Sequence, residues 1–337
     1  YSFKKKRIYY YKNLNTTQKI QSLIIFSMFS VIFPGQGSQS VGMAKNLYEN
    51  HIYIKELFDK ADEILGYKIS KIIFDGPGEI LNNTENTQPA IFLVSYSIFE
   101  TIKRETDINL LNAKYFAGHS LGEYSALCAG AAISFETTIK LLKLRGKSMQ
   151  SAVSEGSGGM VAVLGSEIDK IQNLIKLNSG TYECFIANDN SNGQIVISGE
   201  NKYLDLFMED LKKQSIKNIK LPVSAPFHCK LMKEATNIMK NEIIKTDLKK
   251  PLVPIISNVT SKEENNPNEI KKLLIQQIEN PVRWRESVKY MIDNGVKKFI
   301  EIGPGKVLSG LIKRIDRSVD IVTVNDINDI KNISLND

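Results

Sequence analysis

The chain has 337 residues, 42% of them hydrophobic, which indicates a globular protein with one large domain and an insertion, or with two domains. The formal net charge of +7 would suit a nucleic-acid-binding protein, but residues 1–30 hold six basic residues and no acidic one. Removing those six from the 44 basic residues leaves 38 against 37 acidic residues. The body of the chain is therefore nearly neutral, which argues against nucleic acid as a partner.

Residues 1–28 read "YSFKKKRIYYYKNLNTTQKIQSLIIFSM", a basic leader rich in hydroxyl groups. This composition is typical of organelle transit peptides, and a disordered N-terminus without a targeting role is the alternative. The apolar run at 23–33 is too short to span a bilayer, so we expect a soluble protein without stable membrane insertion. The last part of this run is predicted to be the first core strand.

The three cysteines, Cys128, Cys184 and Cys229, are scattered along the chain, and no C-x-x-C spacing occurs. An odd number without paired spacing supports neither a disulfide framework nor a zinc site. We therefore expect a reducing compartment and no bound metal.

The first half of the chain predicts alternating strands and helices. An apolar run ending at Phe33 breaks at the glycine-rich loop "PGQGSQ", and a helical pattern follows over 44–65. Next come a buried helix in "TQPAIFLVSYSIFETIK", a short strand in "KYFAGHS" and a helix of small residues in "LGEYSALCAGAAI". Ser134 is the predicted N-cap of the helix after these. This alternation is typical of an α/β fold with a mostly parallel sheet.

The stretch "SEGSGGM" at 154–160 predicts a flexible joint. After it the pattern runs strand, helix, strand, strand, helix, strand, with an Asn192-Gly193 hairpin turn between the two middle strands. This order matches the ferredoxin-like arrangement. The predicted boundaries are therefore 153–221 for an inserted ferredoxin-like domain, 29–152 and 222–330 for a larger α/β domain, and 331–337 for a tail.

Ser120 lies at the centre of a G-x-S-x-G motif formed by residues 118–122. A strand before the motif and a helix after it are the context that a nucleophile elbow needs, and the glycines leave room for the tight turn. The backbone N–H of Leu121, at the start of the helix, would face a developing oxyanion. A packing turn with a buried serine is the alternative.

A serine nucleophile needs a base, and the chain holds three histidines. His51 lies in an exposed-looking helical segment, and His119 adjoins the serine, where neighbouring side chains diverge. His228 lies in the proline-flanked loop "PVSAPFHCKLM" at the end of a strand, where a base is expected. We predict His228 as the general base, and a surface loop residue is the alternative.

Two further features bear on the site. Arg145 lies in "KLRGKSM", in the helix after the elbow, and its planar guanidinium suits a carboxylate partner, although a lone helix arginine is usually solvated. The loop "PGQGSQ" offers the backbone N–H of Gln36 as a second oxyanion donor. Neither this loop nor "GPGKVLSG" at 303–310 has the spacing of a phosphate-binding P-loop.

Together these stretches resemble the malonyl-CoA:acyl carrier protein transacylases of type II fatty acid synthesis. The resemblance covers about residues 29–325, and the matching motifs are "FPGQGSQSVGM", "TQPA", "AGHSLGEYSAL", "RGKSMQ", "GQIVISG", "LPVSAPFHCKLM", "NPVRW" and "EIGPGKVLSGL". Their order and spacing are highly specific. The resemblance implies an α/β-hydrolase-like large domain with an inserted ferredoxin-like small domain.

The resemblance also implies a mechanism. Ser120 would be the nucleophile and His228 the general base, with no aspartate completing a triad. Backbone carbonyls hold the histidine in this family, and one of them belongs to a glutamine that matches Gln277. A malonyl group would pass from malonyl-CoA to the serine and then to the phosphopantetheine thiol of acyl carrier protein, in ping-pong fashion.

The remaining implied roles concern the substrate. Arg145 would pair with the malonyl carboxylate, and the backbone N–H groups of Gln36 and Leu121 would form the oxyanion hole. Asn190 would lie in the pocket wall. The bulk of Phe227, next to the base, would favour malonyl over methylmalonyl by crowding the α-carbon.

The resemblance implies no cofactor and no metal, acyl carrier protein and a coenzyme A thioester as partners, and a monomer. The leader is a departure, because a bacterial-type enzyme would not need it. We therefore expect import into an organelle, and the high Lys and Asn content favours a plastid-type organelle, such as an apicoplast, over a mitochondrion.

A serine hydrolase, such as a thioesterase or esterase, is the alternative enzyme class, since it shares the elbow and the base. Candidate triad acids between Ser120 and His228 lie in the predicted insertion rather than beside the histidine, and they are Asp169, Asp189, Asp205 and Asp210. A non-catalytic module that docks the carrier protein is the alternative outside the enzymes. Such a module would be expected to have lost Ser120 or His228.

Overall fold

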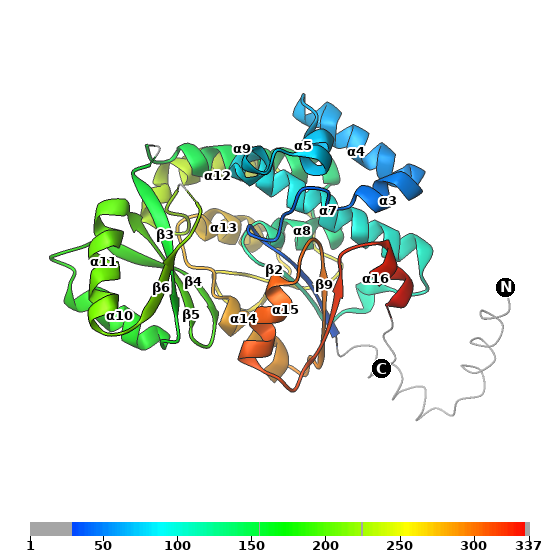
Figure 1. Cartoon of the computed structure of the whole chain (residues 1–337). Coiled ribbons are helices and arrows are strands. Elements are labelled where there is room, and N and C mark those ends of the chain that lie inside the picture. The colour runs from blue at the N-terminus through cyan, green and yellow to red at the C-terminus, as the bar shows by residue number, and fades with distance from the viewer. Residues whose placement is uncertain (1–28, 155, 224, 334–337) are drawn as a thin grey trace.

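The computed structural model describes residues 29–154, 156–223 and 225–333. The predicted leader at 1–28 and the end of the predicted tail, 334–337, lie outside the described residues. The described chain is a mixed α/β structure with a six-stranded and a four-stranded sheet (Figure 1). None of the helices in these described ranges has the length and apolar character needed to cross a membrane.

The six-stranded sheet has the strand order β10-β9-β1-β2-β7-β8. Its neighbouring strands run parallel, except that β7 and β8 are antiparallel. The strands are β1 (Phe29–Phe33), β2 (Tyr115–Gly118), β7 (Ile255–Ile256), β8 (Glu263–Glu264), β9 (Lys298–Ile302) and β10 (Asp320–Val324). The predicted first core strand and the mostly parallel sheet are therefore confirmed.

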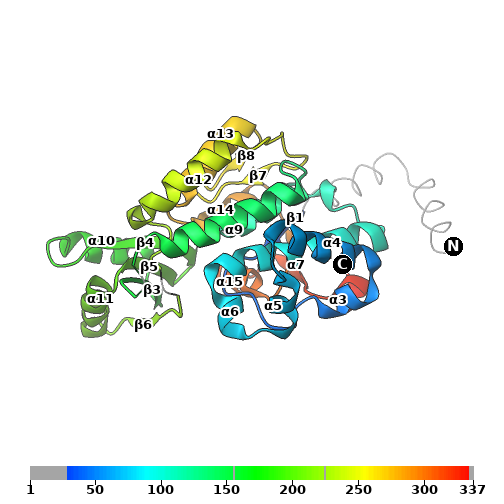
Figure 2. The same cartoon turned by 90° about the horizontal axis from the view of Figure 1, so that it is seen from above.

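Strand β1 is buried on both faces, as expected for a central strand of a parallel sheet. Val31 and Phe33 pack into one hydrophobic cluster, whereas Ile32 packs into a second cluster on the opposite face. The first cluster draws on α7 (Thr84–Glu105), α8 (Gly122–Ala129), α9 (Phe135–Ser151) and α12 (Lys233–Lys245). The second draws on α14 (Trp284–Asp293) and α15 (Val307–Ile315), so helices cover both faces (Figures 1 and 2).

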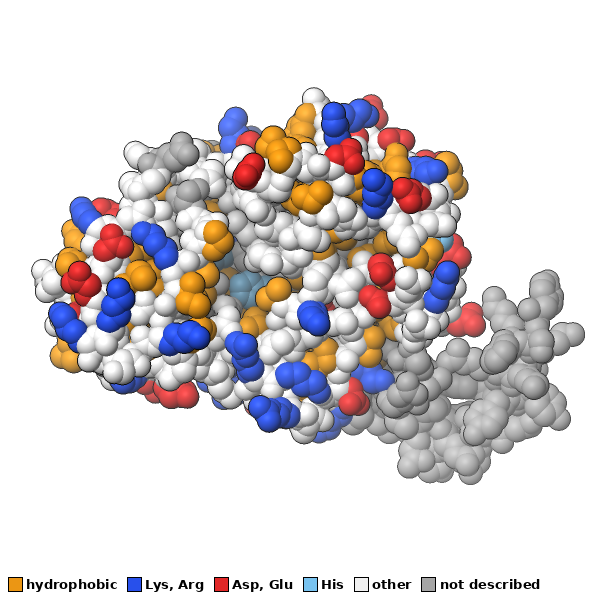
Figure 3. All heavy atoms as spheres, in the orientation of Figure 1, with side chains coloured by type: hydrophobic (Ala, Val, Ile, Leu, Met, Phe, Trp, Pro, Cys, Tyr) orange, Lys and Arg blue, Asp and Glu red, His pale blue; other side chains and the backbone are white. Residues whose placement is uncertain are grey.

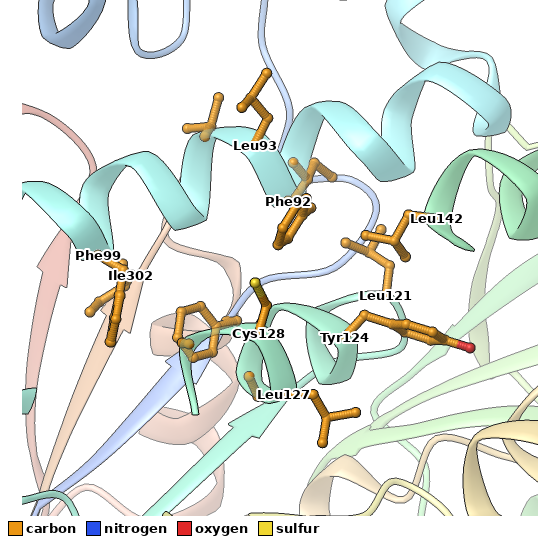
Figure 4. Packing of buried hydrophobic residues seen from close by; sticks show 14 of the residues in the cluster. Phe92, Leu93, Phe99, Leu121, Tyr124, Leu127, Cys128, Leu142 and Ile302 are labelled. Carbon is orange, nitrogen blue, oxygen red and sulfur yellow. The ribbon is translucent and has the colours of Figure 1, made fainter. Parts of the chain in front are cut away.

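Helix α8 packs between the sheet and α7, and every one of its residues is buried. Cys128 of α8 points towards Phe92 of α7, and Tyr124 and Leu127 belong to the same cluster (Figure 4). The small residues predicted for this helix allow such close packing. Helix α8, which begins just after Ser120, is therefore buried along its whole length.

The four-stranded sheet is antiparallel and has the strand order β4-β5-β3-β6. Its elements are β3 (Gly158–Leu164), α10 (Ile168–Leu177), β4 (Cys184–Ser191), β5 (Gln194–Glu200), α11 (Asn201–Lys213) and β6 (Lys217–Lys220), in the predicted order. Gly193, with a φ of 69°, adopts the left-handed conformation in the turn between β4 and β5.

The remaining elements are α3 (Lys45–Asn50), α4 (Ile52–Leu65), α5 (Ile69–Asp75), α6 (Gly78–Asn82), α13 (Pro267–Gln277), α16 (Ile327–Asn332) and the 3₁₀ turns η1 (Leu110–Asn112) and η2 (Lys230–Met232). The single helix predicted over 44–65 is wrong in one respect. The backbone of His51 is extended, with φ −129° and ψ 118°, and this residue separates α3 from α4. The Ser134 N-cap is confirmed, because its hydroxyl accepts from the N–H of Thr137.

The two sheets are joined where β4 meets the segment after α13, a contact that we call the β4 junction. The N–H of Asp189 donates to the carbonyl of Val282 at 2.9 Å, and the N–H of Val282 donates to the carbonyl of Ala187 at 2.8 Å. The carboxylate of Asp189 also pairs with the guanidinium of Arg285, with an N–O distance of 2.8 Å. Backbone and side-chain bonds thus hold the four-stranded sheet to the segment at the start of α14, and this segment packs against the large sheet.

Candidate active site

Ser120 lies at the turn between β2 and α8, as the motif predicts. Its φ of 54° is in the left-handed region, which few non-glycine residues adopt. The flanking glycines make the turn possible. A Cβ at Gly118 would lie 1.9 Å from the carbonyl carbon of Gly122, and a Cβ at Gly122 would lie 2.3 Å from the carbonyl oxygen of Phe33.

His228 is the partner of this serine. Its Nε2 lies 2.8 Å from the Oγ of Ser120, and its Nδ1 lies 2.8 Å from the backbone carbonyl oxygen of Gln277. Because a carbonyl can only accept, Nδ1 carries the proton and Nε2 presents its lone pair to the hydroxyl. Within the described ranges, no carboxylate bonds to this ring, and a carbonyl occupies the position that an aspartate takes in a catalytic triad.

The imidazole is held in its neutral form. Burial, and then the positive charge of Arg145, lower the pKa of His228 to about 3, although bonds to the backbone at Gln277 and Asn280 act in the opposite direction. At pH 7 the ring is therefore free to accept a proton, as a general base must be.

Arg145 of α9 points into the same site and is 1% exposed. Its Nη1 donates to Oε1 of Gln88 at 2.8 Å, and its Nη2 donates to Oε1 of Gln277 at 2.8 Å and to the Oγ of Ser120 at 3.1 Å. Burial lowers its pKa, but an arginine stays charged in proteins. The alternative of a solvated helix arginine is therefore wrong, and a fixed positive charge lies beside the serine.

A network of buried polar side chains holds Ser120 and Arg145 in place. The side-chain Nε2 of Gln277 donates to the carboxyl group of Glu123 at 2.7 Å and to the backbone carbonyl of Ser120 at 3.1 Å. The Oδ1 of Asn258 accepts from the N–H of Ser120 at 2.7 Å, and its Nδ2 donates to the carbonyl of Gly118 at 2.7 Å. The strained turn is thus held by side chains from two other parts of the chain.

The N–H groups of Gln36 and Leu121 have no hydrogen-bond acceptor among the described residues. Both residues line the pocket around Ser120. Unpaired N–H groups at the start of a helix and in a glycine-rich loop are suited to stabilise a negatively charged oxygen. Gln36 and Leu121 stay the predicted donors of an oxyanion hole.

The pocket lies between the two sheets, and its walls come from both. Residues on the large-sheet side are Gln36, Gln88, His119, Ser120, Leu121, Arg145 and Met149. The opposite wall and rim are formed by Met160, Asn188, Leu221, Val223, Phe227 and His228. In Figure 3 a histidine surface is visible in the hollow between the two parts of the molecule.

The structure brings the predicted site residues together, with one difference. Asn190 was predicted in the pocket wall, but Asn188 of the same strand lines the pocket instead. Asn190 lies behind it, with its Oδ1 2.8 Å from Nε2 of His119. Burial lowers the pKa of His119 to about 4, so this ring is neutral at pH 7. It forms part of the pocket wall, whereas His228 is the ring bonded to Ser120.

Comparisons with known proteins identify the family. A family model described as an acyl transferase domain matches residues 30–332. A malonyl CoA-acyl carrier protein transacylase of Bacillus subtilis is 43% identical over 302 residues, which are 89% of this chain and 94% of the relative. The chain belongs to the malonyl-CoA:acyl carrier protein transacylase family. It is therefore an acyltransferase, and the resemblance drawn from the motifs is confirmed.

Solved structures of this family share the fold. An acyl-carrier-protein-S-malonyltransferase from Bartonella henselae matches with a TM-score of 0.87 and 41% identity, over 90% of this chain and 97% of that one. A malonyl-transacylase solved in complex with a type II PKS acyl-carrier protein matches with a TM-score of 0.86 and 37% identity, over 90% of this chain and 98% of that one.

Several residues of the site were not found by sequence reasoning. Gln88 stands in the motif "TQPA", which by itself indicates only a buried helix and the family resemblance. Asn258 follows strand β7, which neighbours β2, so its place at the carboxyl edge of the sheet was the available signal. Glu123 gave no separate signal, because it reads as an ordinary acid in the first turn of a helix.

Proposed function

We propose that this acyltransferase moves a malonyl group from malonyl-CoA to the phosphopantetheine thiol of acyl carrier protein through a malonyl-serine intermediate, and so supplies type II fatty acid synthesis. The observation that carries the proposal is the distance of 3.1 Å between Nη2 of Arg145 and the Oγ of Ser120. A buried, fixed positive charge next to the nucleophile suits an acyl group that ends in a carboxylate.

The acylation half begins with proton transfer from Ser120 to Nε2 of His228 as the serine attacks the thioester carbonyl. The N–H groups of Gln36 and Leu121 would receive the oxyanion that develops on this carbonyl. The bond to the coenzyme A sulfur then breaks, and His228 returns the proton to the leaving thiolate. The malonyl carboxylate would meanwhile take the place at Arg145 that the serine hydroxyl holds in the free enzyme.

The transfer half repeats these steps with a new thiol. The phosphopantetheine thiol gives its proton to His228 and attacks the malonyl-serine ester, and the serine leaves with that proton. Apolar side chains around the ester limit access of water: Met149, Met160, Leu221, Val223 and Phe227. Phe227 would also crowd a substituent on the α-carbon, which favours malonyl over methylmalonyl.

The proposal includes acyl carrier protein and a coenzyme A thioester as partners, no resident cofactor and a monomer. The order of elements from β3 to β6, with strand order β4-β5-β3-β6, supports a ferredoxin-like insertion at 153–221 in an α/β-hydrolase-like domain. Import into a plastid-type organelle stays a prediction from residues 1–28. A reporter fused to residues 1–30 of the full precursor tests it, and a cytosolic signal would contradict it.

The first experiment is the intact mass of the protein after mixing with malonyl-CoA, beside Ser120→Ala as the control. We expect a malonyl-sized adduct on the wild-type protein, none on Ser120→Ala, and loss of the adduct when phosphopantetheinylated carrier protein is added. Turnover to free malonate without an adduct or transfer would instead favour a hydrolase. Binding of the carrier protein without any reaction would favour a docking module.

A further inference from the structure

Glu123 is a buried acid that takes no part in the steps above. It lies in the first turn of α8, three residues after Ser120, and is 2% exposed. Its Oε2 accepts two hydrogen bonds, from the backbone N–H of Asn258 at 3.1 Å and from Nε2 of Gln277 at 2.7 Å. Burying a carboxyl group lowers the stability of the fold unless hydrogen bonds compensate for the lost water. These two bonds provide that compensation.

Three acceptors face Nε2 of Gln277: the Oε2 of Glu123 at 2.7 Å, the carbonyl of Ser120 at 3.1 Å and the Oδ1 of Asn258 at 3.4 Å. A guanidinium can only donate, and the Oε2 of Glu123 acts as an acceptor for two donors. Because Nε2 of Gln277 is directed to Glu123, Oε1 is directed to Nη2 of Arg145 at 2.8 Å. The reversed amide would set two donors against each other at the arginine and two acceptors against each other at the acid. Glu123, the nearest of the acceptors of Nε2, therefore helps to keep the amide oxygen of Gln277 on Arg145.

Glu123 is also linked to the nucleophile Ser120, through Asn258. Asn258, whose N–H bonds to Glu123, holds the N–H of Ser120 at 2.7 Å and the carbonyl of Gly118 at 2.7 Å. The backbone carbonyl of Gln277 holds the base at 2.8 Å. One carboxyl group is thus two hydrogen bonds away from the arginine, the serine and the strained turn.

We propose that Glu123 is a positioning residue, which orients Gln277 and Asn258 so that Arg145 and Ser120 keep the relative placement that an acidic acyl group requires. The inference rests on the proposed function, since it takes the malonyl carboxylate as the partner of Arg145. A neutral acyl group makes no use of the guanidinium. Loss of Glu123 therefore reduces the use of malonyl-CoA more than that of acetyl-CoA.

The test compares kcat/KM for malonyl-CoA and for acetyl-CoA in three variants. Glu123→Met, which has a similar length and no oxygen, should lower the ratio of malonyl to acetyl use by about tenfold, the effect of one lost bond to a charged group. Glu123→Gln should restore most of the ratio, because one oxygen can still accept both bonds. Glu301→Met is the matched control, since Glu301 is also buried and accepts bonds from Leu308 and Ser309 away from the pocket. It should leave the ratio unchanged.

A double-mutant cycle distinguishes positioning from a general loss of structure. In an Arg145→Ala background, Glu123→Met should produce no further fall in the ratio, because the residue through which it acts is gone. Equal proportional losses for both substrates, or losses in the ratio that multiply in the double variant, would overturn the proposal. If Glu123→Met does not fold, Glu123→Ser is measured in the same way, since its short hydroxyl does not replace Oε2.

A crystal structure of the folded variant separates this inference from the proposed function. We expect the side chain of Gln277 to have shifted after loss of its bond to Glu123, and its 2.8 Å bond to Arg145 to be lengthened or lost. An unchanged bond would overturn the inference. Absence of a malonyl adduct on the wild-type protein would refute the proposed function instead. The Gln277–Arg145 distance in the variant structure would still test the role of Glu123.

Discussion

Nε2 of His228 lies 2.8 Å from the Oγ of Ser120, while the opposite ring nitrogen bonds to a peptide carbonyl rather than to a carboxylate. A neutral carbonyl fixes the tautomer of the ring but stabilises an imidazolium less than an aspartate does. The proton taken from the serine is therefore held weakly and is easily returned. This arrangement suits a reaction in which both the leaving group and the acceptor are thiols.

The pH dependence of acylation should reflect this neutral base. Since burial and Arg145 lower the pKa of His228 to about 3, the ring stays unprotonated as the pH falls through its ordinary value of 6.5. The rate of malonyl-serine formation should therefore be nearly constant from about pH 5 to pH 8. Single-turnover measurements across this range test the prediction, and a fall centred near pH 6.5 would contradict it.

The stability of the protein should depend on pH through Glu123. Burial raises the pKa of this carboxyl group from 4.5 to about 7, so the folded state binds its proton more tightly than the unfolded state does. The resulting stabilisation is fully present below pH 4.5 and is lost as the pH rises through 7. The loss amounts to at most about 3 kcal/mol, at about 1.4 kcal/mol for each pKa unit.

Denaturant unfolding of the wild-type protein and of Glu123→Gln at pH 5 and pH 8 measures this effect. The difference between the two proteins isolates Glu123, because every other titrating group is common to both. The variant should gain stability relative to the wild type as the pH rises. A difference that does not change with pH would refute the raised pKa.

Removal of the guanidinium should affect acid substrates selectively. Arg145→Ala is expected to lower kcat/KM for malonyl-CoA by about ten- to a hundredfold, the effect of one lost charge-assisted pair. Acetyl-CoA has no carboxylate and serves as the control substrate, for which the variant should lose much less. Arg145→Lys should not restore malonyl use fully, because a lysine cannot reach Gln88 and Gln277 with a planar fork.

The glycines at the elbow should tolerate no side chain. Gly118→Ala would place a Cβ 1.9 Å from the backbone of Gly122, so the turn must open and the protein should lose both stability and activity. Gly310→Ala is the matched control, since nothing lies within 4 Å of its Cβ and the residue belongs to helix α15. This control should gain up to about 1 kcal/mol from its higher helix propensity. Melting temperatures of the two variants test the contrast.

Much of the large sheet and the elbow could be predicted, because local signals there agree with the tertiary structure. The strand ending at Phe33 and the motif around Ser120 each combine an apolar run with glycines that no helix interior favours. The break at His51 could not be predicted, because a helical pattern continues across it and the backbone is extended there. Element boundaries of this kind depend on packing that the local sequence does not contain.

The supporting network of the site could not be derived in the same way. Glu123 and Asn258 are 135 positions apart, and their bond exists only because β2 and β7 are neighbours in the sheet. The resemblance implies Asn190 in the pocket wall, but β4 is irregular, with register shifts between 186 and 188 and between 189 and 191, and Asn188 lines the pocket. Such register shifts depend on how two strands pair, so the sequence of one strand does not predict them.

The β4 junction has a consequence for the evolution of substrate range. Since Met160 and Asn188 of the pocket lining lie on strands of the four-stranded sheet, their positions depend on how Asp189, Val282 and Arg285 hold that sheet in place. Substitution of Phe227 changes one lining side chain, whereas loss of the Asp189–Arg285 pair would affect the strands that carry Met160 and Asn188. Substrate selectivity can therefore change through substitutions at positions that do not contact the substrate.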